Sequence, residues 1–394
     1  MADFKLTPAP LECREGVFAS GGSTSGAHAL PETLSAEKFR LWERQWNNHW
    51  TLADANWADG DVTHVKWLEK AAASDSATWM RSTECAQLGQ TMTDTALAER
   101  APEWAPRALR VLRLTGAFFN AADLIVGENA LLVFLAHVQD PQVKLALLAQ
   151  GGFESLHAVG YQEMLTVLEP DPAKREALLE LPKASPAAAK ICNLFKSVMQ
   201  SDSYDGEGSL AHRLVLFAAA EWTVFQCLFA IIFYFRTVNL FPAARRLNTK
   251  ISEDERLHTD LTAFMYASLS KTRLSDDETV SMVRRVVLLV FDFIDELAEG
   301  EEQVLPALTC SDMKRWTAFT ANHLLRKGLQ VDRSLQVEID GQAADLETNP
   351  IEYMEMISLT PATNFIEAKA TTYSQLTTRP TAGAVLDGGF DDDL

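Results

Sequence analysis

The sequence predicts an all-α protein built on a bundle of long helices. Two Glu-x-x-His pairs, Glu154–His157 and Glu255–His258, lie about one hundred residues apart, and residues at i and i+3 share one face of a helix. Two further acids, Asp123 and Glu221, lie in apolar stretches in which a lone carboxylate would be costly to bury. Strand patterns are few, and the best of them is LQVEID at 335–340.

Long stretches of apolar periodicity predict the individual helices. They cover 106–137, 141–168, 174–200, 209–236, a helix that starts near Pro242, 276–298 and 311–328. Pro141 lies in the first turn of its helix, and PDP at 170–172 ends that helix. Ser252, with Glu255 three residues later, also resembles a capping box and would place a helix start there, although Glu255 is equally expected as a metal ligand.

Four regions follow from composition. Residues 1–35 are rich in Gly, Ser, Pro and Ala and are expected to form a flexible arm. Residues 36–103 are polar and Trp-rich, and most of the tryptophans are expected to pack against the bundle. Residues 104–330 form the bundle. Residues 331–394 form a C-terminal segment whose Gly-, Thr- and Asp-rich end is expected to be disordered.

Charge and cysteine content exclude several classes of protein. With 394 residues, 47% of them hydrophobic, the chain can bury a large core. Its 35 basic and 54 acidic residues give a net charge of −19, which argues against nucleic-acid binding. The N-terminus shows no signal peptide. Five scattered cysteines indicate free thiols and a cytoplasmic location, and they are Cys13, Cys85, Cys192, Cys227 and Cys310.

One segment is long and apolar enough to raise the question of a membrane span. Residues 214–235 carry a single charge over 22 residues. The alternative is a central helix that is buried on all sides of a bundle. Glu221, Thr223 and Gln226 favour the buried helix, because a metal would neutralise the acid, and no membrane span is therefore predicted.

The acid and histidine pattern predicts a site for two metal ions. Each Glu-x-x-His pair can present one carboxylate oxygen and one imidazole nitrogen to the same point, and two carboxylates from two further helices complete a four-helix site. Carboxylate and imidazole ligands suit iron and manganese.

Tyr161 lies four residues after His157 and therefore falls near the metal face. Apolar residues from two other helices are placed to surround its phenol, and they are Phe225, Phe229 and Ile251. Ordinary core packing of a tyrosine is one interpretation. The coincidence of positions favours the other, in which the metal centre oxidises the phenol and a dry pocket protects the radical.

Several segments carry a family resemblance. AFFNAADLIVGEN contains Asp123, FESLHAVGY contains the first Glu-x-x-His pair and Tyr161, and ISEDERLH contains the second pair. NPIEYMEMISLTPATNFIEAKATTYSQL leads towards the C-terminus. With the helix that carries Glu221, these segments resemble the radical-generating small subunit of class I ribonucleotide reductase, over about residues 104 to 394.

The resemblance implies a ferritin-like bundle, a homodimer and a di-iron-oxo centre, with manganese possible. The reduced metal pair is expected to react with dioxygen and to oxidise Tyr161. The oxidising equivalent is then expected to pass to a separate large subunit, which reduces ribonucleotides to deoxyribonucleotides for DNA replication. By position the implied ligands are Asp123, Glu154, His157, Glu221, Glu255 and His258.

The resemblance also implies a transfer path. Asp254 is expected to hydrogen-bond His157, Trp50 to continue the path towards the surface, and Tyr373 to relay the radical between subunits. The terminal GGFDDDL, with Phe390 and Leu394 as apolar anchors, is expected to dock on the large subunit.

Two features depart from the family pattern, and two rival functions stay open. Trp50 and Asp123 lie about twice as far apart as expected, so residues 58–100 look like an insertion and Trp46, Trp57 or Trp79 are alternative relay residues. The N-terminal arm has no assigned role.

One rival function is another di-metal oxidase or monooxygenase of the same fold. The other is a non-enzymatic helical membrane or scaffold protein.

Overall fold

The computed structural model describes residues 16–18, 35–57, 60–199 and 209–354. Most of the expected N-terminal arm lies outside the described residues. The same holds for Cys13, Tyr373 and the GGFDDDL tail, so the expectations that concern them remain predictions.

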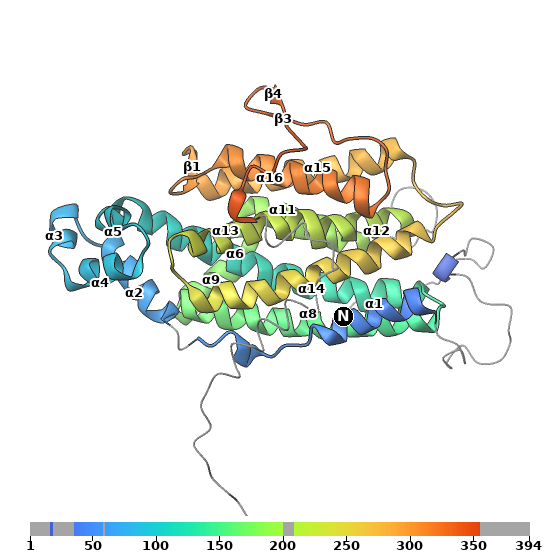
Figure 1. The fold of residues 1–394 in the computed structure, drawn as a ribbon, viewed down its shortest axis with the longest axis horizontal. Coiled ribbons are helices and arrows are strands. Elements are labelled where there is room, and N and C mark those ends of the chain that lie inside the picture. Colours follow the sequence, from blue (N-terminus) through green and yellow to red (C-terminus); the bar gives the residue numbers. More distant parts are fainter. Residues whose placement is uncertain (1–15, 19–34, 58–59, 200–208, 355–394) are drawn as a thin grey trace, which may run out of the picture. The chain divides into compact units, whose positions relative to one another are not determined.

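Four long helical segments form the bundle, which confirms the predicted all-α fold (Figure 1). They are α6 (Ala101–Glu128), α8 (Pro141–Leu168), α12 (Leu210–Ala218) continued by α13 (Phe225–Thr237), and α14 (Pro242–Ala267). A π-helical turn, Ala219–Val224, joins α12 to α13. The segments pack as α6 on α8, α8 on α14, and α13 on both α14 and α6.

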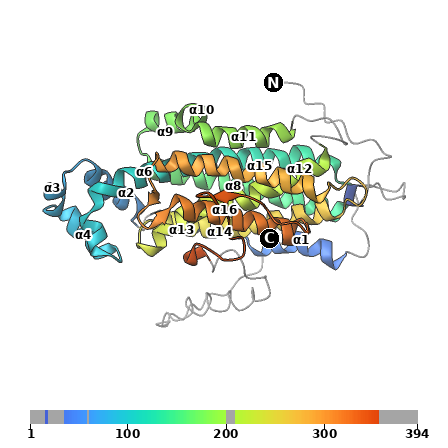
Figure 2. The same ribbon diagram turned by 90° about the horizontal axis from the view of Figure 1, so that it is seen from above.

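Shorter helices surround these four. They are α1 (Ala36–Asn47), α2 (Asp61–Ala72), α3 (Ser76–Met80), α4 (Thr83–Thr91), α5 (Thr95–Glu99), α7 (Leu135–His137), α9 (Pro172–Leu179), α10 (Leu181–Ala184), α11 (Pro186–Met199), α15 (Asp276–Ala298) and α16 (Cys310–His323). Helix α1 packs along α8 and α14, and α15 packs on α11, α12 and α16 (Figure 2). The remaining turns are 3-10 turns at Gly16–Phe18, Leu52–Asp54 and Glu352–Met354, and π-helical turns at Asn129–Phe134 and Leu324–Gly328.

Strands are confined to two small hairpins in the described part of the chain. β1 (Gln303–Leu305) pairs antiparallel with β2 (Leu308–Thr309), and β3 (Glu338–Ile339) pairs antiparallel with β4 (Gln342–Ala343). The strand predicted over 335–340 is therefore only two residues long.

Several helix boundaries differ from the prediction. The helix predicted from Pro106 begins at Ala101 and contains that proline. The single helix predicted over 174–200 is broken into α9, α10 and α11. Ser185 has an extended backbone there, as expected for a residue that precedes a proline. By contrast, α8 and α15 begin and end at the predicted residues.

The capping box predicted at Ser252 is wrong. Ser252 lies in the middle of α14, and its hydroxyl bonds to the backbone carbonyl of Thr249 at 3.0 Å. The helix begins ten residues earlier, at Pro242. The Ser-x-x-Glu spacing arises inside the helix because residues at i and i+3 share a face there.

The N-terminus of α14 is capped by side chains of α2. Phe241 precedes the helix with φ of 52° and provides no side-chain cap. Instead, the Asp61 carboxylate accepts the backbone N–H groups of Ala243 and Ala244, both at 2.9 Å. His64 Nδ1 accepts the N–H of Phe241 at 3.1 Å. These bonds satisfy buried amide groups at the helix start and fix the position of α14.

The expected insertion at 58–100 has two parts. Helix α2 packs on α6 and α8 and belongs to the bundle. Helices α3, α4 and α5 pack mainly on one another and lie together at one end of the bundle (Figure 1). Trp79 is buried among them, and its indole N–H donates to the carbonyl of Ala98.

Two helical segments are long and apolar enough to cross a membrane, by length and composition alone. They are Ala101–His137 and Leu210–Thr237. In the second, 94% of the apolar window is buried inside the fold, as expected for the central helix of a bundle. In the first, only 56% is buried, so this apolar helix leaves a large surface exposed.

Candidate metal centre

The six predicted ligands lie together in the centre of the bundle. Asp123 comes from α6, Glu154 and His157 from α8, Glu221 from the π-helical turn, and Glu255 and His258 from α14. All six side chains are buried, with at most 1% of their surface exposed. The pattern at i and i+3 brings each Glu and His of a pair to one side of its helix, and the packing of the helices brings the four sides together.

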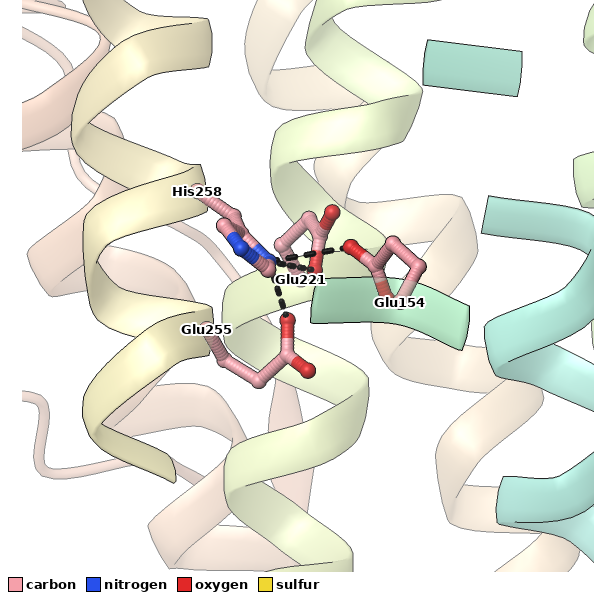
Figure 3. Close-up of side chains that lie close together, drawn as sticks. All are labelled: Glu154, Glu221, Glu255 and His258. Carbon is pink, nitrogen blue, oxygen red and sulfur yellow. Dashed lines mark hydrogen bonds and ion pairs between the residues drawn. The ribbon is translucent and has the colours of Figure 1, made fainter. Parts of the chain in front are cut away.

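Glu154 joins two groups of ligands. One group is Asp123, Glu154 and His157, and the other is Glu154, Glu221, Glu255 and His258; in each, the ligand atoms lie within 4.8 Å of one another. In the second group, His258 Nδ1 lies 2.9 Å from Glu154 Oε1 and 3.2 Å from Glu255 Oε2 (Figure 3). Two adjacent sites that share one carboxylate are typical of a di-metal centre.

One ring nitrogen of His157 faces the cluster, and the other points away from it. Its Nδ1 lies 3.0 Å from Glu255 Oε1 and 3.4 Å from Glu154 Oε2. Neither Nδ1 nor Glu255 Oε1 has a hydrogen-bond partner. Its Nε2 lies 3.0 Å from Asp254 Oδ2. The cluster side of the ring is thus an acceptor that faces other acceptors, which is the arrangement expected around a cation.

The unpartnered atoms fit metal ions. Buried side-chain atoms without a hydrogen bond in the cluster are both oxygens of Asp123, Glu154 Oε2, His157 Nδ1, Glu221 Oε2, Glu255 Oε1 and His258 Nε2. Buried polar atoms are normally satisfied, so such a concentration needs an explanation. Four ionised carboxylates would be neutralised by two divalent cations, and an oxygen-rich set with two imidazoles suits iron or manganese.

The shifted pKa values of the cluster residues reflect the same lack of positive charge inside the cluster. Burial, followed by repulsion from Glu255, raises the pKa of Asp123 well above its usual value. Burial and repulsion from Glu255 also raise the pKa of Glu221. Burial lowers the pKa of His157, but the neighbouring carboxylates of Asp254, Glu154 and Glu255 outweigh it, and the net pKa is raised. Without metal ions, protons on the imidazoles and acids must supply the missing positive charge.

Gln150 contacts two of the acids, although the sequence pattern did not single it out as a site residue. It lies one turn before Glu154 on α8 and is fully buried. Its Nε2 donates to Glu221 Oε1 at 2.9 Å and lies 3.4 Å from Glu154 Oε1. Gln150 therefore orients carboxylates from two different helical segments.

Tyr161 lies beside this cluster in a closed aromatic pocket. The residue is fully buried, and its ring stacks on Phe119 with centroids 4.5 Å apart and planes 6° from parallel. Phe225 and Phe229, predicted to surround the phenol, both contact the ring of Phe119, with ring centroids 5.5 and 5.3 Å apart. Ile251, the third predicted pocket residue, is buried on α14. Phe119 is thus the ring that covers Tyr161 directly.

Burial, followed by the charge of Asp123, raises the pKa of the Tyr161 phenol well above its usual value. The hydroxyl donates a hydrogen bond to Asn248 Oδ1 at 3.1 Å. Tyr161 is therefore a protonated phenol that is shielded from water, and the negative charges of the cluster acids act on it.

Comparison with known proteins places this site in a family. The model of the family "Ribonucleotide reductase, small chain" matches residues 106–333, which hold all six cluster residues. The chain belongs to the ribonucleotide reductase small-chain family. The ribonucleoside-diphosphate reductase small chain of Trypanosoma brucei brucei is 29% identical over 259 residues, which cover 66% of this chain and 71% of that protein.

Solved structures from the same family share the fold. The ribonucleotide reductase R2 subunit from Clostridium botulinum superposes with a TM-score of 0.62 at 13% identity, covering 83% of this chain and 89% of that chain. The dimanganese(II)-NrdF of Streptococcus sanguinis superposes with a TM-score of 0.53 at 12% identity, covering 83% and 99%. At these identities the structures support the helical-bundle fold alone.

In this small-chain fold, a hydrogen-bonded chain leads out of the cluster. Asp254 Oδ2, which lies next to His157, accepts the indole N–H of Trp50 at 2.7 Å. Asp254 Oδ1 accepts from the side chain of Asn48 at 2.6 Å. The Trp50 ring also stacks on the His157 ring, with centroids 6.1 Å apart and planes 12° from parallel. His157, Asp254 and Trp50 are thus connected by direct contacts.

The alternative relay tryptophans lie elsewhere. Trp46 is half exposed and packs on Phe153, Trp57 bonds to Glu163, and Trp79 lies among the α3–α5 helices. Within the described residues, none of these three bonds to Asp254, whereas Trp50 does. Helices α2 to α5 lie between Trp50 and α6 in the chain, and whether α3 to α5 are an insertion relative to the family stays a prediction.

Sequence reasoning did not single out three buried residues as parts of the site, namely Phe119, Asn248 and Gln150. A signal existed for two of them. Phe119 lies four residues before Asp123, and Gln150 lies four before Glu154, so each shares a helix face with a predicted ligand. Asn248 lies three residues before Ile251, which places it on the face that was assigned only to apolar residues.

Proposed function

We propose that the chain is the radical-generating small subunit of a ribonucleoside-diphosphate reductase. The metal centre and dioxygen oxidise Tyr161 to a radical, and the oxidising equivalent passes to a separate large subunit that reduces ribonucleotides to deoxyribonucleotides. One observation carries this proposal. A fully buried tyrosine, one turn after His157, lies in an aromatic pocket beside the metal-ligand cluster of a small-chain family member.

Two metal ions would be held by the six cluster residues. Asp123 and His157 would bind on one side, Glu221, Glu255 and His258 on the other, and Glu154 would bind both ions, as its membership of both groups suggests. A bound redox-active pair supplies the oxidising equivalent that it draws from dioxygen. We propose iron as the metal. Manganese is the alternative, supported by the likeness to the dimanganese(II) protein of Streptococcus sanguinis.

Asp254 orients His157 for this task. Its carboxylate lies 3.0 Å from Nε2 and holds this outer nitrogen of the ring, which leaves Nδ1 turned towards the cluster and available to a metal ion. Carboxylates that hold the outer nitrogen of a metal-binding histidine fix the ring and raise its basicity.

Tyr161 is the residue to be oxidised. Its burial excludes water from the ring and hydroxyl. A phenol that loses one electron becomes strongly acidic, so its proton would leave Oη. The acids of the neighbouring cluster, among them Asp123, would accept that proton.

Trp50 offers the outward path. The contacts from His157 through Asp254 to Trp50 are continuous and buried. We propose that the path continues through Tyr373 and that the GGFDDDL tail docks on the large subunit. Both lie outside the described residues, and both proposals rest on the family resemblance.

The exposed apolar surface of α6 and α8 supports a homodimer. Two helices that pack on each other carry exposed apolar side chains, namely Leu124 and Leu132 on the segment that begins with α6, and Leu148 and Val159 on α8. Large exposed apolar patches mark protein interfaces. We propose that a second copy of the chain covers this surface.

We also propose a cytoplasmic location, in line with the four free cysteines among the described residues.

Electron paramagnetic resonance tests the radical. Purified metal-free protein is loaded with ferrous iron, or with manganese, and exposed to dioxygen. We expect a tyrosyl signal that disappears in Tyr161→Phe while two metal ions per chain are still bound. A signal that persists in Tyr161→Phe, or no signal with either metal, would overturn the proposal.

A truncation tests the partner. Removal of residues 388–394 should leave the radical intact and abolish turnover with the large subunit. Full turnover by the truncated chain would show that the tail does not dock there.

A further inference from the structure

The hydroxyl of Tyr161 makes its hydrogen bond to a neutral amide. Oη donates to Asn248 Oδ1 at 3.1 Å, and this is its one hydrogen bond within the described residues. The nearby acid does not take this bond, since both oxygens of Asp123 lack a hydrogen-bond partner. The residue in direct contact with the reacting oxygen atom is thus Asn248.

Asn248 is held firmly in place. The residue is fully buried on α14, seven residues before Glu255. Its Nδ2 donates to the carbonyl of Ala244 at 2.8 Å and lies 3.6 Å from the sulfur of Met164. The amide therefore presents a fixed acceptor to the phenol. Because an amide oxygen accepts hydrogen bonds but is a very weak base, Asn248 orients the phenol without removing its proton.

We propose that Asn248 is a positioning residue for Tyr161, which holds the phenol by accepting its hydrogen bond and favours the phenol over the radical form. This inference rests on the proposed function. In the phenol form Oδ1 accepts from Oη, as the structure shows. The oxygen of a tyrosyl radical would carry no hydrogen, since the phenol has then lost both an electron and a proton. Asn248 Oδ1 would then face a second acceptor, which is unfavourable.

A half-turn of the amide would not remove that conflict. Rotation about the Cβ–Cγ bond would bring Nδ2 to the radical oxygen, but it would turn Oδ1 towards the carbonyl of Ala244, which is another acceptor. Asn248 therefore stabilises the phenol form of Tyr161 more than the radical form.

The test compares two buried asparagines. Asn248→Leu removes both ends of the amide at nearly constant volume. Asn322→Leu is the matched control, because Asn322 is also buried, accepts one backbone N–H from Leu335, and lies on α16 without a bond to Tyr161. Both variants are checked for folding by circular dichroism and for metal content after loading.

Two readouts follow the two forms. In metal-free protein, ultraviolet resonance Raman spectra with Tyr161→Phe as the subtraction reference report the phenol's hydrogen bond. We expect Asn248→Leu to lose that bond and Asn322→Leu to keep it. In loaded protein, the radical half-life should rise about fivefold in Asn248→Leu, the factor that corresponds to the one hydrogen bond that favours the phenol. The control should keep the wild-type half-life.

A third measurement needs no substitution. Wild-type radical prepared in D2O should show no exchangeable deuteron strongly coupled to the radical oxygen by electron–nuclear double resonance, because Asn248 presents an acceptor to it. A wild-type radical with such a coupling overturns the preference for the phenol form, and an unchanged Raman difference in Asn248→Leu overturns the positioning role. A wild type that forms no radical would overturn the proposed function, while the metal-free spectrum would still decide the bond to the phenol.

Discussion

Two buried groups of acids and histidines contact or include residues of α14. They differ in whether hydrogen-bond donors satisfy them. At the N-terminus of the helix, Asp61 and His64 accept three backbone N–H groups. Further along, the cluster around Glu255 holds four acids and two histidines, each of which has at least one unpartnered atom. Burial is nearly complete at both places.

The spacing of these groups is the same. Asp61 and His64 form an acid-x-x-His pair on a helix, as do Glu154–His157 and Glu255–His258. The first pair is a structural cap, because backbone donors satisfy it. We propose the other two as ligand pairs, because their acceptors face one another. The difference teaches that hydrogen-bond satisfaction, more than burial or spacing, separates a structural acid from a metal-binding one.

The largest expected effect is on the satisfied pair. Asp61→Leu leaves the N–H groups of Ala243 and Ala244 buried and unpaired, at about 1–3 kcal/mol each. Urea unfolding of the metal-free protein should show a loss of about 2–6 kcal/mol. Asp61→Asn keeps one acceptor and should lose about half as much. A loss below about 1 kcal/mol in Asp61→Leu would contradict the capping role.

The pH dependence of stability tests the same cap through His64. Burial, followed by the charge of Arg245, lowers the pKa of His64 from 6.5 to about 4. The neutral form is the one whose Nδ1 accepts from the backbone N–H of Phe241. A pKa that is depressed on folding gives stability that is present above pH 6.5 and lost as the pH falls towards 4. The loss should be about 3 kcal/mol. His64→Asn retains an acceptor that does not titrate, so its unfolding free energy should lack the fall between pH 6.5 and 4. The same pH profile in the variant and the wild type would contradict this role of His64.

The unsatisfied acids should behave in the opposite sense. Asp123→Leu removes a buried carboxylate whose oxygens have no donor, so metal-free protein should gain about 1–3 kcal/mol in urea unfolding. The same variant should lose the thermal stabilisation that added metal gives the wild type. Destabilisation of metal-free Asp123→Leu, matching Asp61→Leu, would remove the contrast between the two regions.

Asp254 and Trp50 extend the comparison to the proposed transfer path. Their polar atoms have hydrogen-bond partners, although both residues belong to that path. Trp50→Phe keeps the ring against His157 and removes the N–H that bonds Asp254. Turnover with the large subunit should fall about 10–100-fold, while the Tyr161 radical still forms. Trp57→Phe is the control, because its N–H bonds Glu163 at the periphery. Equal losses in both variants would argue against a path through Trp50.

Much of the bundle could be predicted from local signals. Helices α8 and α15 have the predicted ends because proline and capping residues mark them in the chain. The prediction failed where a local pattern had two meanings. The Ser252–Glu255 spacing is common to helix starts and helix interiors, and only the cap at Asp61 shows where α14 begins.

The sequence by itself determined the helices, the two Glu-x-x-His pairs and the nearness of Tyr161 to one of them, because these depend on residues within a turn or two of each other. The tertiary structure decided which acid-x-x-His pair is a cap, that Trp50 reaches Asp254, and that Phe119 and Asn248 enclose Tyr161. These contacts join residues 40 to about 200 positions apart. No local periodicity encodes such contacts, since they arise only when the helices pack.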